Sequence, residues 1–170
     1  MPRIHVCSLA LIGETVERTG ARTLVTLLNP DTVVVRPPAI APERHLYIGV
    51  ADIIEETPGH VLPVHLHVRE LLEFVATWDR EAPLLIHCFA GVSRSTAAAY
   101  ISACALAPHR DEAEIALALR AASPTATPNG RLIALADAAL SREGRMTRAI
   151  ESIGRGQECF EGIPFALEIA

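Results

Sequence analysis

A strand, a short loop and a helix follow one another in the segment Leu84–Ala99, whose sequence is LLIHCFAGVSRSTAAA. An apolar run leads into His87 and Cys88, a loop with Gly91 follows, and an alanine-rich stretch begins near Arg94. A loop that opens a helix directs several backbone N–H groups, and the positive end of the helix dipole, at one point. This segment therefore predicts an anion site, and the anion that we expect there is a phosphate.

The side chains of this loop add chemistry to the anion site. Cys88 lies at its mouth, where the helix N-terminus and Arg94 both favour the ionised thiolate, which is a nucleophile. Arg94 offers a planar pair of donors that matches two oxygens of a phosphate. Gly91 lets the backbone curl without a side chain that would block the anion. Ser95 is placed to donate a hydrogen bond to the cysteine sulfur, and His87 to order the loop through its ring nitrogens.

His87, Cys88, Gly91, Arg94 and Ser95 resemble the HCxxGxxRS signature of the cysteine-dependent protein tyrosine phosphatase superfamily, in its small, bacterial-type, dual-specificity-like form. The resemblance implies that the thiolate attacks phosphorus while the arginine and the loop amides hold the phosphoryl oxygens. The amides that it assigns to phosphate binding are those of Phe89, Ala90, Gly91, Val92, Ser93 and Arg94. The alternative is a buried structural cysteine, followed by a surface cation on the next helix.

A candidate general acid precedes this loop. The predicted strand His45–Val50 delivers Asp52 to a loop, and if this strand is parallel to the one that ends at His87, both loops open at the same carboxyl edge of the sheet. Asp52 would then face Cys88. The run YIGVADIIEE also resembles the segment of dual-specificity phosphatases in which a tyrosine-led strand ends in the acid, although it has no WPD tripeptide. The competing carboxylates are Glu55 and Glu56.

Length and periodicity favour one α/β domain over residues 1–170. We expect a central, mostly parallel sheet of four to five strands flanked by helices, like that of the dual-specificity phosphatases. Residues 143–170 would form a C-terminal helix and a tail that packs on the domain. The predicted strands are Arg3–Cys7, Leu24–Leu28, His45–Val50 and one that ends at His87. The predicted helices are Gly13–Thr19, Pro63–Trp78, Ser95–Leu106, one from Asp111 to Ala121, and Arg131–Leu140. A β-branched run, Asp31–Val35, stops at Arg36-Pro37-Pro38.

Composition narrows the classes of function. Half of the residues are hydrophobic but only 4% are aromatic, which favours an aliphatic, helix-rich core. The net charge of −5 argues against a nucleic-acid-binding protein. No apolar run reaches the roughly 20 residues that a membrane span needs, and the N-terminus lacks the apolar region of a signal peptide. We therefore expect a cytoplasmic protein that binds neither nucleic acid nor membrane.

The cysteines and histidines predict neither a disulfide framework nor a metal site. No CxxC pair occurs among the four cysteines, which favours reduced thiols. Cys104 is expected to pack as a small hydrophobe, whereas Cys7 could act as a resolving thiol for oxidised Cys88. His65 and His67 lie two apart in a predicted helix and point to different sides, so we interpret them as solvated or capping. We expect no metal and no cofactor.

Together these patterns predict a phosphatase that hydrolyses phosphomonoesters through a phosphocysteine intermediate. The loop carries no lysine, which would have favoured polyphosphorylated inositides, so we expect a singly phosphorylated group, foremost protein phosphotyrosine. The partner would be a phosphorylated protein or a small phosphomonoester, and the sequence leaves the oligomeric state open. Two alternatives are a phospho-binding module with little or no turnover and a rhodanese-like sulfur transferase, whose loop also begins with a cysteine at a strand end.

Overall fold

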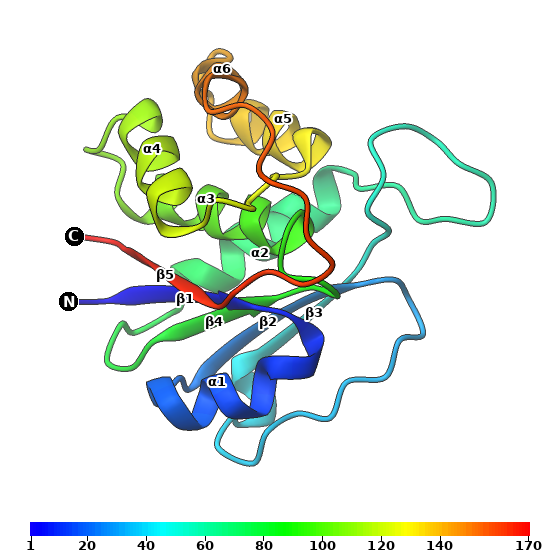
Figure 1. Ribbon diagram of the computed structural model, residues 1–170, viewed down its shortest axis with the longest axis vertical. Helices are drawn as coiled ribbons and strands as arrows, with labels where there is room; N and C mark the ends of the chain where they lie inside the picture. The colour runs from blue at the N-terminus through cyan, green and yellow to red at the C-terminus, as the bar shows by residue number, and fades with distance from the viewer.

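A computed structural model describes all residues, 1–170, as one α/β domain built on a five-stranded sheet (Figure 1). The strands lie in the order β3-β2-β4-β1-β5, and all neighbours are parallel except β5, which runs antiparallel to β1. This confirms the expected mostly parallel α/β sheet. The strands are β1 (Arg3–Cys7), β2 (Thr23–Leu28), β3 (His45–Gly49), β4 (Leu84–His87) and β5 (Phe165–Glu168).

The parallel register brings the carboxyl ends of four strands together at one edge of the sheet. His87 at the end of β4 pairs with Thr26 of β2 on one side and with Cys7 of β1 on the other. Leu28 of β2 in turn pairs with Gly49 of β3. The loops that follow β3 and β4 therefore open at the same edge, where ligands bind in open α/β folds.

Helices lie on both faces of the sheet, with α1 (Ile12–Thr19) on one face and the later helices on the other (Figure 1). On the α1 face a small apolar cluster includes Ile12, Val16, Leu24 and Leu85. None of the helices is both long and apolar enough to cross a membrane. The helices are α1 (Ile12–Thr19), α2 (His65–Ala76), α3 (Arg94–Leu106), α4 (Glu112–Ala122), α5 (Gly130–Ala139) and α6 (Arg145–Ser152), with short 3-10 turns at Leu9–Leu11 and Pro42–Arg44.

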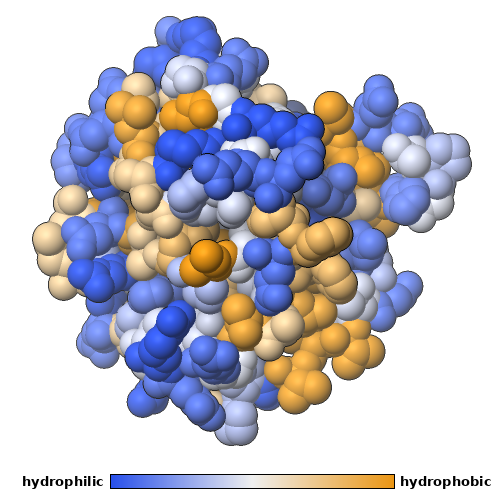
Figure 2. Space-filling model, viewed as in Figure 1, coloured by the Kyte–Doolittle hydropathy of each residue, from blue (hydrophilic) through white to orange (hydrophobic).

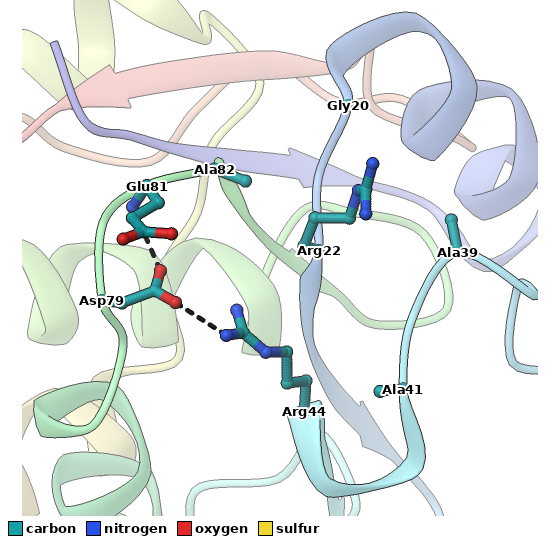
Figure 3. Close-up of a pocket in the computed structure, with 8 residues that line it drawn as sticks. All are labelled: Gly20, Arg22, Ala39, Ala41, Arg44, Asp79, Glu81 and Ala82. Carbon is teal, nitrogen blue, oxygen red and sulfur yellow. Dashed lines mark hydrogen bonds and ion pairs between the residues drawn. The ribbon is translucent and has the colours of Figure 1, made fainter.

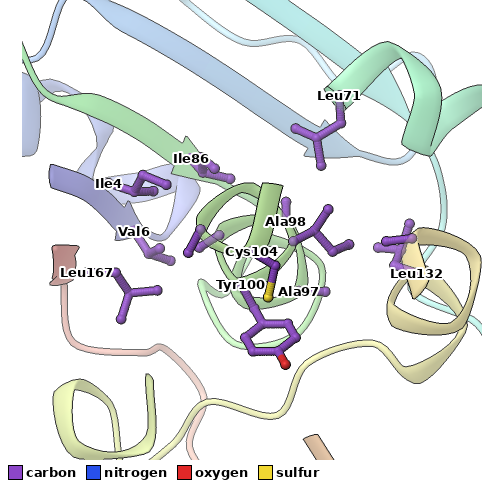
Figure 4. Packing of buried hydrophobic residues seen from close by; sticks show 14 of the residues in the cluster. Ile4, Val6, Leu71, Ile86, Ala97, Ala98, Tyr100, Cys104, Leu132 and Leu167 are labelled. Atoms are coloured by element: carbon purple, nitrogen blue, oxygen red, sulfur yellow. The ribbon is translucent and has the colours of Figure 1, made fainter. Parts of the chain in front are cut away.

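Helix α3 is the centre of the larger core. Every residue from Arg94 to Cys104 is buried, which agrees with its nearly uniform apolar sequence. Figure 4 shows Tyr100 and Cys104 on this helix among apolar side chains from β1, β4 and the neighbouring helices. The Tyr100 hydroxyl donates to the Glu112 carbonyl at 3.0 Å, so its one polar atom is satisfied. Because α3 is fixed on all sides, its N-terminus is fixed as well.

Two segments differ from a simple extension of the sequence pattern. The β-branched run Asp31–Val35 forms no strand, and its residues Val33 and Val35 are exposed. Figure 2 shows hydrophobic surface at the lower right, on the side where Figure 1 shows the loop between β2 and β3. Asn29-Pro30 and Pro37-Pro38 bracket the run, and proline lacks the N–H that a strand needs. In contrast, the tail contributes more than a helix and a wrapping segment, because it ends in strand β5 at the edge of the sheet.

Glu112 joins α4 to α6. Its side chain is 7% exposed and accepts hydrogen bonds from Arg142 at 2.7 Å and from Arg145 at 3.2 Å. Burial alone would raise the pKa of this carboxyl, but the bonds from Arg142, from the backbone and from Arg145 hold the pKa below its usual value. The ionised carboxylate therefore favours the folded state at neutral pH.

We expect Glu112→Gln to lower the free energy of unfolding by about 2 kcal/mol at neutral pH, because Arg142 is then left buried beside an uncharged partner. As the pH falls through the lowered pKa of Glu112, the parent loses the same contribution and the difference should narrow. Urea denaturation at about pH 7 and about pH 3.5 measures this. The control is Glu114→Gln, which removes an ion pair with Arg110 whose carboxylate is exposed; an equal loss in both variants would contradict the expectation.

Candidate functional site at the carboxyl edge of the sheet

Cys88 follows β4 and lies beneath the N-terminus of α3. Its side chain is buried, and its Sγ lies 3.0 Å from the Ser95 hydroxyl on the first turn of that helix. The sulfur therefore has a hydrogen-bonding partner that is itself fully buried. The structure places Ser95 where the sequence predicted it, within hydrogen-bonding distance of the thiol.

The backbone of the 88–94 loop turns its carbonyl groups outward. Amide groups of four residues outside the loop donate to it: Leu9 to Phe89, Gly162 to Ala90, Thr127 to Val92 and Asn129 to Ser93, at 2.8 to 3.2 Å. In contrast, no backbone N–H of residues 89–93 donates to another residue of the protein. These donors are therefore free to bind an anion in front of Cys88.

The Arg94 guanidinium completes the ring of donors. Its Nη1 donates to the Val50 carbonyl at 2.9 Å and to the Asn29 side-chain oxygen at 3.2 Å, which fixes the group between the ends of β2 and β3. Arg94 is 8% exposed, and its Nε is buried without any hydrogen-bond partner. Because an unpaired buried donor is costly, this nitrogen needs an acceptor from outside the protein.

Gly91 is required for two reasons. Its φ of +72° lies in the left-handed region, which favours glycine. A Cβ on this residue would also lie 2.9 Å from the backbone carbon of Cys7 at the end of β1. The loop therefore packs directly on the neighbouring strand, as only glycine allows.

His87 orders the loop through both ring nitrogens. Its Nδ1 lies 3.0 Å from the Cys88 carbonyl, which can only accept, so this nitrogen carries the hydrogen. The Nε2 is then an acceptor for the Thr26 hydroxyl at 2.7 Å, and that hydroxyl oxygen accepts from His45 Nε2 at 2.8 Å. Burial, with His45 and Arg94 nearby, lowers the pKa of His87 to about 4, so the ring is neutral at neutral pH. No local sequence pattern marks Thr26 and His45 as members of this network.

Asp52 lies at the rim of the loop. Its Oδ1 accepts from the Ser93 hydroxyl at 2.7 Å and from the Asn129 side-chain amide at 2.9 Å, which leaves Oδ2 without a partner in the protein. Asn129 also caps α5 by accepting from the Leu132 amide. The side chains of Glu55 and Glu56 are exposed and make no such bonds. The structure thus ties Asp52, rather than either glutamate, to the loop.

The remaining candidates lie apart from this constellation or serve other purposes. No group of three or more histidine, cysteine or acidic residues has a metal-binding arrangement. His67 accepts from the Val64 amide at 3.0 Å and caps α2, as one of the two roles expected for it. Burial raises the pKa of the Cys7 thiol to about 12, which favours a packing role over that of a resolving thiolate.

A cavity of about 490 Å³ opens at the edge of the sheet opposite Cys88, near the amino ends of β2, β3 and β4 (Figure 3). Two arginines, Arg22 and Arg44, line it. Arg44 is ion-paired with Asp79 at 2.7 Å, and Glu81 donates its amide to the same carboxylate. The cavity contains no nucleophile. The chemistry of the molecule is therefore concentrated at the edge that holds Cys88.

Comparison with solved structures places this arrangement among known folds. Human DUSP28 superimposes with a TM-score of 0.63 at 19% identity, over 82% of this chain and 94% of that one. DUSP15 gives 0.61 at 20% identity, over 88% and 90%. The chain has the dual-specificity phosphatase fold. The PTP-2 phosphatase of Cydia pomonella gives 0.62 at 18% identity, over 79% and 84%. No protein-family model and no curated protein matches the sequence.

The buried His87 predicts a pH dependence of stability. The unfolded chain binds a proton on this histidine near pH 6.5, whereas the folded protein does so only near pH 4, so the free energy of unfolding should fall as the pH falls through this interval. His87→Gln should flatten this slope, as measured by urea denaturation. The exposed His109→Gln is the control and should keep the slope of the parent. A slope in His87→Gln as steep as that of the parent would contradict the assignment.

Proposed function

We propose that the protein is a phosphatase that hydrolyses phosphomonoesters through a phosphocysteine intermediate on Cys88. The observation that carries the proposal is the buried, unpaired Nε of Arg94 beside a loop whose amides have no partner in the protein. Together they supply donors for the oxygens of a tetrahedral anion directly in front of a thiol. The neighbours in fold whose names give an activity are phosphatases, which supports the same conclusion.

In the first step the Cys88 thiolate attacks phosphorus, a sulfur–phosphorus bond forms, and the bond to the leaving oxygen breaks. Arg94 and the loop amides stabilise the charge on the equatorial oxygens. Asp52 donates its proton to the leaving oxygen, and Oδ2 is the atom in position to carry it because Oδ1 is already bonded twice.

In the second step Asp52 takes a proton from water, and the water oxygen attacks the phosphocysteine. The bond between sulfur and phosphorus breaks, and inorganic phosphate leaves. Ser95, 3.0 Å from the sulfur, donates to the thiolate as it departs. His87 holds the Cys88 carbonyl and so positions the loop without contacting the substrate.

The expected substrate is a singly phosphorylated group, foremost phosphotyrosine on a protein. The residues of the loop interior, Phe89, Ala90, Val92 and Ser93, include no lysine that would bind a second phosphate. The two alternatives predict different results. A phospho-binding module would bind phosphopeptide with little or no turnover, and a rhodanese-like transferase would move sulfur from thiosulfate without hydrolysing a phosphate ester.

We expect Cys88→Ser to abolish the hydrolysis of an aryl phosphate while phosphate binding persists, because the serine hydroxyl is not ionised at neutral pH. Release of inorganic phosphate measures the activity, and protection from thermal unfolding by vanadate or phosphate measures binding. Cys104→Ser, at a buried cysteine away from the site, is the control. Turnover by Cys88→Ser at the rate of the parent would overturn the mechanism.

We expect Asp52→Asn to lower kcat by roughly 10² to 10⁴, because the amide cannot donate a proton to the leaving group. The loss should be greater for an alkyl or unsubstituted phenyl phosphate than for p-nitrophenyl phosphate, whose leaving group needs less protonation. Glu55→Gln, three residues away and exposed, is the matched control. A fall in Glu55→Gln with full activity in Asp52→Asn would transfer the role of general acid to that glutamate.

A further inference from the structure

The tail crosses the rim of the site between α6 and β5. In Figure 1 the orange-to-red segment after α6 passes close to the green loop between β4 and α3. At one end the Gly156 amide donates to the Thr127 hydroxyl at 3.1 Å, and at the other the Gly162 amide donates to the Ala90 carbonyl at 2.8 Å. Glu161 adds a hydrogen bond from Ser8. We call residues 156–162 the C-terminal wall.

Both ends of the C-terminal wall require glycine. A Cβ on Gly156 would lie 2.5 Å from the backbone carbon of Thr125, and a Cβ on Gly162 would lie 2.7 Å from the Gly91 carbonyl oxygen. Real Cβ atoms essentially never approach backbone so closely. The wall is therefore built to lie directly against the 88–94 loop and the segment before α5.

Between these two contacts the wall presents its side chains to solvent and to a groove. Phe160 is fully exposed, and it lines a groove of about 650 Å³ together with Val92 and Ser93 of the loop and with Asp52. A single exposed apolar residue needs no explanation, but this one shares a concave surface with the proposed general acid.

A second groove, of about 450 Å³, opens on the other side of Asp52. It is lined by the segment after Asp52, including Ile54, which is 64% exposed, and by the start of α5. The two grooves share Asp52, Ser93 and Thr127, so they meet at the rim of the 88–94 loop. Each groove contains one exposed large apolar side chain.

We propose that the C-terminal wall determines substrate specificity, with Phe160 packing against an apolar residue beside the phosphorylated residue of a bound peptide. The inference rests on the proposed phosphatase function and adds which residues select the substrate. A peptide whose phosphorylated side chain enters the anion site, and whose backbone turns so that the adjacent side chains also face the protein, would lay these along the two grooves, one against Phe160 and the other against Ile54. A small phosphomonoester would leave both grooves without contact.

Charge excludes one class of flanking sequence. The grooves carry the carboxylates of Asp52, Glu55 and Glu158 against the single cation Arg155, which lies 3.7 Å from Glu158. Acidic residues next to the phosphorylated one would meet this negative surface. The two grooves therefore favour apolar over acidic residues next to the phosphorylated one.

The test compares kcat/KM for three substrates: a phosphotyrosine peptide with leucine on both sides, the same peptide with aspartate on both sides, and p-nitrophenyl phosphate. The parent should prefer the leucine peptide to the aspartate peptide. Phe160→Ala should lower the ratio of kcat/KM for the leucine peptide to that for p-nitrophenyl phosphate by about tenfold, as for the loss of one interface anchor. The control Leu117→Ala, at an exposed leucine on α4, should keep the ratio of the parent.

Each result either supports or overturns the role of the C-terminal wall in substrate recognition. Because Phe160 is fully exposed, its alanine variant should keep the melting temperature of the parent, so a changed ratio reports recognition. An unchanged ratio in Phe160→Ala, or a parent that hydrolyses both peptides equally, overturns the role of the wall while the phosphatase function stands. If the parent hydrolyses no substrate, the proposed function fails, and fluorescence anisotropy of the labelled leucine peptide tests the wall: weaker binding by Phe160→Ala supports it, and equal binding overturns it.

Discussion

The outward orientation of the carbonyl groups in the 88–94 loop is the constraint on which the site depends. Five of these carbonyls, from Cys88 to Ser93, accept hydrogen bonds from donors that lie outside the loop or, for Cys88, from the His87 ring. Since a peptide unit has its N–H and its carbonyl on opposite sides, fixing the carbonyls outward leaves the amides directed inward. The anion site is thus a consequence of how the loop is held from outside.

The donors that hold the loop come from distant parts of the sequence. Leu9 follows β1, Thr127 and Asn129 precede α5, and Gly162 lies between α6 and β5. Arg94 is fixed in the same way by Asn29 and Val50 at the ends of β2 and β3. The strand order explains part of this, because parallel pairing brings the segments that follow β1, β2 and β3 to one edge, and the antiparallel β5 begins at that edge. Stability of the sheet and geometry of the site are consequently inseparable.

The sequence predicts those parts of the site whose residues lie close together along the chain. The strand–loop–helix pattern from β4 to α3 and the placement of Ser95 beside Cys88 follow from spacing alone, and so does the common edge shared with Asp52 once the strands are taken as parallel. Thr26, His45, Asn29 and Asn129 were not foreseen, because their partners lie 19 to 77 residues away and no local pattern marks them. Strand β5 was missed for a similar reason: its four residues form a strand only by pairing with β1.

The C-terminal wall contains positions that tolerate substitution and positions that do not. Gly156 is confined by the backbone of Thr125 and Ala126, and Gly162 by that of Gly91, so substitution would displace the segment before α5 or the 88–94 loop, respectively. Apart from Glu161, which accepts a hydrogen bond from Ser8, the residues between the two glycines have side chains that face solvent, and change among these costs the fold little. A scaffold of this kind can acquire new preferences by drift in a few surface positions while its reaction chemistry stays the same.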